Sequence, residues 1–158
     1  YFVGGIYTED GIPRYKLVDG QPVERTQEEL DADRLAPAKA AKIAKSKADL
    51  KAYLATHPYQ WTDGKKYNIT DEKTGWLTSK VVAATAAAGI GVPYNLKWND
   101  TGMVCEEWNL ADLTALALAI DARVTSLVAY QQTQEVAINA AQTMAELEAI
   151  EVNYETVQ

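Results

Sequence analysis

The sequence has very few of the residues that build disulfides, metal sites and most catalytic centres. Its 158 residues include one Cys, at position 105, and one His, at position 57. One Cys excludes an intrachain disulfide, and one His with one Cys leaves too few ligands for the usual structural zinc sets. Gly89 and Gly91 stand outside any phosphate-binding glycine motif. We therefore expect no metal, no cofactor and no enzyme activity.

Basic residues are scarce in the second half of the chain. Residues 1–80 hold 13 basic and 12 acidic side chains, whereas residues 81–158 hold 2 and 10, and the whole chain carries a net charge of −7. Binding to a phosphate backbone needs clustered Lys and Arg. The longest weakly apolar stretch we note, residues 81–93, is far shorter than the roughly 20 residues of a membrane span. We expect neither a nucleic acid nor a membrane as a partner.

Residues 1–25 are predicted to form a β meander that serves as a docking arm. Two β-rich runs, 1–8 and 12–18, are separated by turn residues, and Asp19-Gly20 is a strong hairpin signal. A hairpin of this size is marginal in water by itself, so its apolar residues are expected to pack against another protein. The candidate contact residues are Tyr1, Val3, Tyr7, Tyr15 and Leu17.

Residues 26–56 are predicted to form a helical linker. Thr26 and Glu29 make a capping box, and Pro37 is expected to interrupt the pattern and open a second helix over residues 38–55. A thin apolar stripe predicts an exposed strut or a weak coiled coil. This helix carries a cluster of lysines, which are Lys39, Lys42, Lys45, Lys47 and Lys51. The cluster is either a solvated face, which is the interpretation we favour, or a contact site for a nucleic acid or another anionic surface.

Residues 57–158 are predicted to form an α+β module. Thr70 caps a helix that ends at Gly89, with Trp76 and Leu77 on its core side. A hairpin over residues 94–105 is expected to follow. Overall, the sequence predicts an α+β, mainly helical fold: an N-terminal β meander, a helical strut, then a small module of helix, β-hairpin and long helix.

In the predicted hairpin, Trp98 faces inward on the first strand, and Met103 and Cys105 alternate on the return strand. Cys105 is therefore interpreted as a small buried hydrophobic residue. Near the end of the chain, Thr143 and Glu146 form another capping box, and residues 152–154 are predicted to add an edge strand.

A long helix is predicted over residues 110–140, with Asn109 as its cap. It would extend roughly 45 Å at 1.5 Å per residue, more than a small domain covers. Its apolar seam includes Val124, Gln131, Gln134 and Ile138, and polar seam residues of this kind fix register and oligomer state. The seam predicts either an oligomer, with a trimer as one form, or the core helix of a monomer.

Glu106 and Glu107 stand beside Trp108, with Trp98 across the hairpin. Such an arrangement is typical of a cleft that contacts sugar, and Trp108 is a candidate contact residue. The alternative, which we favour, is that Glu106 faces solvent and the Trp rings pack the domain.

From Trp61 to its end the chain resembles a domain of unknown function that recurs in tailed-bacteriophage tail, tail-fibre and tail-fibre-assembly-like proteins. The segments that carry the resemblance are YNITDEK (67–73), LKWNDTG (96–102), LTALALAID (113–121), YQQTQE (130–135) and AELEAIEVNY (145–154). Residues 15–24 and 26–29 are similar to short phage accessory proteins.

The resemblance implies a structural protein of the phage tail, at the fibre or baseplate, that acts by protein–protein assembly. It implies other tail proteins as partners and a location in the virion after synthesis in the bacterial host cytoplasm. It carries over no catalytic residues. Two alternatives remain: a chaperone of tail-fibre assembly, and a tail module that binds a host receptor or surface glycan.

Overall fold

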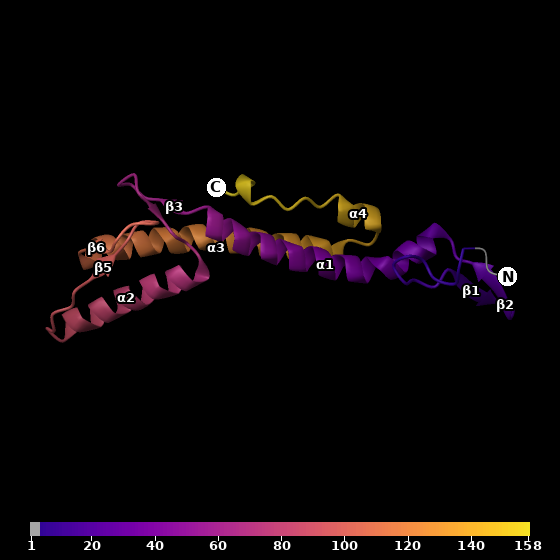
Figure 1. Ribbon diagram of the computed structural model, residues 1–158, viewed down its shortest axis with the longest axis horizontal. Helices are drawn as coiled ribbons and strands as arrows, with labels where there is room; N and C mark the ends of the chain where they lie inside the picture. The colour runs from indigo at the N-terminus through magenta and orange to yellow at the C-terminus, as the bar shows by residue number, and fades with distance from the viewer. Residues whose placement is uncertain (1–3) are drawn as a thin grey trace. The chain divides into compact units, whose positions relative to one another are not determined.

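The structure is a computed structural model and describes residues 4–158 (Figure 1). It is α+β and mainly helical, with an N-terminal hairpin followed by helices, which confirms the predicted fold class. Tyr1 and Val3 lie outside the described residues. The helices are α1 (Gln27–Thr56), α2 (Asp71–Gly89), α3 (Leu110–Ala140), α4 (Met144–Glu148) and the 3₁₀ helix η1 (Tyr154–Thr156).

The six strands form three separate two-stranded antiparallel sheets. The pairs are β1 (Tyr15–Val18) with β2 (Gln21–Glu24), β3 (Tyr59–Gln60) with β4 (Lys66–Tyr67), and β5 (Lys97–Trp98) with β6 (Glu106–Glu107). Because each pair is local, none of these sheets links distant parts of the sequence.

The chain folds into two compact units, and neither is continuous in sequence. The first contains the residues up to Ser46 together with Gln132–Val152, and the second contains Lys47–Gln131 together with Asn153–Gln158. The long helices α1 and α3 therefore each contribute residues to both units.

The predicted helix caps are present. Thr26 and Glu29 exchange two bonds: the Thr26 amide donates to Glu29 Oε2 at 3.0 Å, and the Glu29 amide donates to Thr26 Oγ1 at 3.3 Å. The side chain of Asn109 accepts from the Asp112 amide at 2.8 Å, which places the start of α3 at the predicted residue. Thr70 and Thr143 cap α2 and α4 in the same way. Side-chain acceptors satisfy amides that have no partner in the first turn, so these starts are encoded locally.

The predicted break at Pro37 is wrong, because α1 runs without interruption from Gln27 to Thr56. Proline removes one helical hydrogen bond, yet the residues on both sides of it are fixed by packing. Leu35, Ala38 and Ile43 all pack against the core of the first unit. This packing on both sides of Pro37 is our explanation for the continuous helix.

The core of the first unit is small and lies between α1, α3 and α4. Ile138, Ala141 and Leu147 are buried there, and partly buried residues surround them: Leu35, Ala38, Ile43, Met144 and Ile150. Because α1 also buries Ser46 and Leu54, it is not the exposed strut that its thin apolar stripe predicted.

The second unit has a larger core, which includes Trp98 as predicted. Its buried side chains come from α1, β4, α2, β5 and α3; among the largest are Tyr67, Ile69, Leu77, Trp98, Leu113, Leu116, Ile120 and Leu127. Leu77 lies in this core, but Trp76 is 51 % exposed, which contradicts the prediction that both face inward. Successive helical residues point about 100° apart, so one helix face cannot take both. The Lys73 ammonium lies 5.0 Å from the Trp76 ring centroid.

Two further predictions near the hairpin and the C-terminal segment are wrong. Cys105 is exposed, as is Met103, because β5 and β6 pair over two residues only, Lys97↔Glu107 and Trp98↔Glu106. Residues 99–105 therefore form the turn rather than a return strand. The predicted edge strand at 152–154 is absent from the described residues, because the chain turns into η1, where Tyr154 is buried against Tyr53 and Tyr130.

Candidate protein-docking surfaces

The docking arm, defined here as residues 4–25, is built around the β1–β2 hairpin. Asp19 and Gly20 form its two-residue turn, with φ values of 52° and 78°. Positive φ at both central residues is the requirement of the turn that best fits twisted strands. Leu17 pairs with Pro22, and a single bridge between Tyr7 and Pro13 extends the arm toward its first residues.

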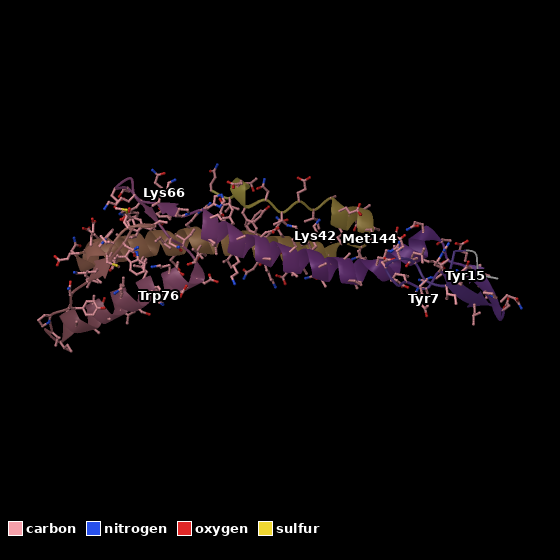
Figure 2. The ribbon with its side chains drawn as sticks, viewed as in Figure 1. Tyr7, Tyr15, Lys42, Lys66, Trp76 and Met144 are labelled. Atoms are coloured by element: carbon pink, nitrogen blue, oxygen red, sulfur yellow. The ribbon has the colours of Figure 1, made fainter. Side chains whose placement is uncertain are left out.

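Large apolar side chains of the arm remain in solvent. Leu17 is 75 % exposed, and Tyr7, which Figure 2 labels, is also exposed; both were predicted contact residues. Tyr15, also predicted, is half-buried. Leu17 and Val18 are successive strand residues, so they point to opposite faces of the hairpin. The arm therefore presents apolar groups on both faces.

Ion pairs fasten the arm to the start of α1. Arg34 holds Asp10 through two bonds, Nε to Oδ2 at 2.6 Å and Nη2 to Oδ1 at 3.0 Å, and this contact holds the pKa of Asp10 well below its usual range. Lys16 pairs with Glu29 and lowers the pKa of that carboxyl group. Arg25 lies 2.7 Å from Asp33. Charged groups thus hold the arm, while its apolar groups stay available to a partner.

The predicted seam on α3 faces the interior of the chain's own units. Gln131 is buried, Ile138 is fully buried in the first unit, and Gln134 is half-buried. Val124 is half-buried and lines a groove with residues of α2. Gln131 and Ile138 therefore have almost no exposed surface to offer to a partner.

Two lysines of the predicted cluster donate hydrogen bonds to carbonyl groups at the C-terminal ends of helices in the first unit. Lys39 Nζ donates to the Asn139 carbonyl at 2.8 Å, at the end of α3. Lys42 Nζ donates to the Leu147 carbonyl at 2.7 Å, at the end of α4. The last carbonyls of a helix have no intrahelical partner and favour positive charge. These two ammonium groups are thus engaged in the fold. Sequence reasoning missed this role because about 100 residues separate each pair.

The one histidine and Glu106 both contact neighbouring side chains. The His57 ring stacks on Tyr53 at 3.9 Å, and its Nε2 lies 3.0 Å from Glu155 Oε1. Glu106 pairs with Lys65 at 3.0 Å and raises the pKa of that lysine. Among residues 4–158, no three His, Cys, Asp or Glu side chains are placed to hold a metal ion together.

Trp108 is half-buried rather than laid open as a sugar platform. Its ring meets the buried Tyr67 edge-on, with the centroids 5.8 Å apart. This contact packs part of the Trp108 ring against the core of the second unit, and a role of Trp108 in sugar contact stays a prediction.

No family model, curated protein or solved structure matches the chain.

Helix α3 has the length and composition of a membrane-spanning segment. Of its most apolar 18-residue window, 22 % is buried in the structure. Core helices of soluble proteins pass the same test of length and composition. The expectation that no membrane is involved therefore stays a prediction.

Proposed function

We propose that the chain is a structural protein of a bacteriophage tail, at the fibre or baseplate, and that it acts by protein–protein assembly without bond chemistry. The observation that carries the proposal is the docking arm, an ion-paired hairpin with apolar side chains on both faces. The resemblance of residues 61–158 to phage-tail domains supplies the setting. The partners in this proposal are other tail proteins, and the location is the virion.

Docking of the arm would bury its exposed apolar side chains. Burying a Val, Leu or Ile side chain is worth about 1.5–3 kcal/mol, and the arm exposes Ile6, Leu17, Val18 and Val23. Association also costs translational and rotational freedom, so a stable contact needs about 1,200 Å² or more of buried surface. Because the ion pairs already order the arm, docking pays little further entropy for folding it.

Gene deletion and complementation test this role. We expect a phage lacking the gene to produce particles with incomplete tails, and the wild-type chain supplied in trans to restore infectious particles. Leu17→Asp should fail to restore them, because a carboxylate in an apolar contact loses its hydration.

Val104→Asp is the matched control, because Val104 is 77 % exposed and lies outside the arm, in the β5–β6 turn. It should restore infectivity. Complete tails in the deletion strain, or full rescue by Leu17→Asp, would contradict the proposal. Circular dichroism of each purified variant should match that of the wild type.

A further inference from the structure

A polar pocket, which we call the basic pocket, lies in the second unit between the end of α1, the β3–β4 pair and α3. Its volume is about 300 Å³, at the lower end of the range for ligand pockets in proteins. Three of its lining residues are basic, namely His57, Lys66 and Arg123, and none is acidic. By contrast, the groove between α2 and α3 is lined by Asp71 and Asp121. The charges around the basic pocket therefore favour an anionic ligand.

The basic pocket differs in charge from the rest of the chain. Residues 81–158 carry ten acidic side chains and two basic ones, and Arg123 is one of the two. A surface with an excess of negative charge repels an anion, and a local group of cations attracts it. In a chain of net charge −7, a site for an anion needs such a group of cations.

Arg123 is held in a fixed orientation by two hydrogen bonds. Its Nη1 donates to the Val157 carbonyl at 2.7 Å, and its Nη2 donates to the Tyr53 hydroxyl at 3.3 Å. A guanidinium group has five N–H donors in one plane, so these two bonds fix the plane and leave further donors for a ligand. This planar arrangement matches the oxygen atoms of a carboxylate or a phosphate group. Because the side chain is already ordered, binding costs it little further entropy.

Lys66 brings a second cation to the basic pocket (Figure 2 labels Lys66). It is exposed, and within residues 4–158 no acidic side chain forms an ion pair with it, whereas its neighbour Lys65 lies 3.0 Å from Glu106. Lys66 is the partner of Gln60 in the β3–β4 pair. Directly opposite residues of an antiparallel pair share one face, so the ammonium group and the Gln60 amide lie near each other.

His57 contributes a wall of the basic pocket rather than a third free cation. Its Nε2 lies 3.0 Å from Glu155 Oε1, and its Nδ1 lies 3.1 Å from the Tyr53 carbonyl oxygen. Glu155 thus balances the charge of a protonated His57 ring. Ile69, which is buried, adds an apolar lining residue. Apolar surroundings strengthen a hydrogen bond between charged groups, because they lower the local dielectric constant.

We propose that the basic pocket binds a small oxyanion, a carboxylate or a phosphate group. Arg123 offers its planar donors and Lys66 its ammonium group, with the Gln60 amide as an uncharged donor beside them. The charge-assisted hydrogen bonds to Arg123 and Lys66 supply most of the affinity. This binding site does not depend on the proposed tail role, since the purified chain contains every residue that forms it.

NMR titration of the full chain tests the site. Sodium acetate, inorganic phosphate and sodium galacturonate are added in separate arms, and chloride keeps the ionic strength constant so that screening does not change. The amides of Gln60 and Lys66 and the side chain of Arg123 should shift and reach saturation. The arm with the lowest dissociation constant identifies the source of the oxyanion: a simple carboxylate, a phosphate or an acidic sugar.

Lys66→Met should raise that dissociation constant at least about tenfold, because a hydrogen bond between charged groups is lost. Lys65→Met is the matched control, since it removes the same charge from the neighbouring residue, which pairs with Glu106 and does not line the pocket. It should leave the constant nearly unchanged. Lys66 is exposed, so its replacement should not impair folding, and urea unfolding checks this.

Shifts that stay linear in all three arms, or equal losses of affinity in Lys66→Met and Lys65→Met, would overturn the site. The second result would show that the anion responds only to the net charge of the chain. Absence of the chain from phage particles overturns the tail role alone and leaves this binding site standing.

Discussion

Tyr67 is a single residue that joins a turn to the core of the second unit. It is 1 % exposed, and its hydroxyl donates to Asp63 Oδ2 at 2.8 Å. Burial, with the Asp63 carboxylate beside it, raises the pKa of Tyr67 well above 10. Burial also raises the pKa of Tyr154 to about 12. Both phenols therefore keep their protons in the folded chain at a pH at which the unfolded chain loses them.

This difference in pKa between the folded and unfolded states determines how the free energy of unfolding changes with pH. The stabilisation is complete below the unfolded pKa of about 10 and declines as the pH rises above it, because the unfolded state then binds fewer protons. We expect Tyr67→Phe to lower the free energy of unfolding by about 1–2 kcal/mol at pH 7 and to make the decline above pH 10 shallower.

Urea unfolding at several pH values measures both effects. Tyr7→Phe, in the exposed part of the arm, is the control and should follow the wild type. A Tyr67→Phe variant with the wild-type slope above pH 10 would contradict the assignment.

Lys42 also acts at the scale of one residue. Lys42→Met keeps the apolar stem and removes the ammonium group that caps α4, so the free energy of unfolding should fall by about 0.5–1.5 kcal/mol. Lys51→Met, at an exposed position of α1, is the matched control. Equal stabilities of the two variants would show that the bond to Leu147 contributes nothing.

At the scale of elements, α1 carries a proline that weakens it. Packing against the core of the first unit keeps α1 continuous at Pro37. The helical hydrogen bond that Pro37 cannot donate still lowers the stability of the folded chain. Pro37→Ala should therefore raise the free energy of unfolding, by up to about 3 kcal/mol. Pro22→Ala, in β2 and outside any helix, controls for the loss of a proline. A Pro37→Ala variant less stable than the wild type would mean that a break at this position is needed.

The docking arm is an element whose order depends on ion pairs. Arg34→Lys keeps the charge but cannot form the two-bond contact with Asp10. Hydrogen exchange should then speed up at the amides of Thr8 and Arg14, which donate to Ile12 and Ile6 carbonyls at 2.9 Å. Added salt should act in the same direction on the wild type. Unchanged exchange in Arg34→Lys would contradict the role given to this pair.

At the scale of the whole molecule, features with local signals could be predicted from the sequence. The Asn109 cap and the apolar repeat placed α3 at residues 110–140, as found. Asp19-Gly20 placed the first hairpin correctly for the same reason. In each of these, the residues that determine the element lie within a few positions of one another.

Features that depend on distant residues could not be predicted in this way. Pro37 lies inside a helix because core residues on both sides of it are fixed by α3 and α4. Lys39 and Lys42 reach carbonyls about 100 residues away. Cys105 failed for a different, local reason: the alternation of residues 94–105 predicted a longer hairpin, whereas β5 and β6 pair over two residues only. The candidate site divides similarly: the exposed arm was expected, whereas the apolar repeat of α3 left open whether Gln131 and Ile138 lie in the interior or in an oligomer contact, and their burial depends on distant residues.

In the proposed role, the chain is part of the phage tail and is joined to it by its docking arm. The most direct measurement is quantitative mass spectrometry of purified, infectious particles from the phage that encodes it. We expect peptides of this chain in a fixed ratio to a known tail protein, from one preparation to the next. Particles that lack the chain, while the host lysate contains it bound to immature fibres, would identify an assembly chaperone and rule out a structural role in the tail.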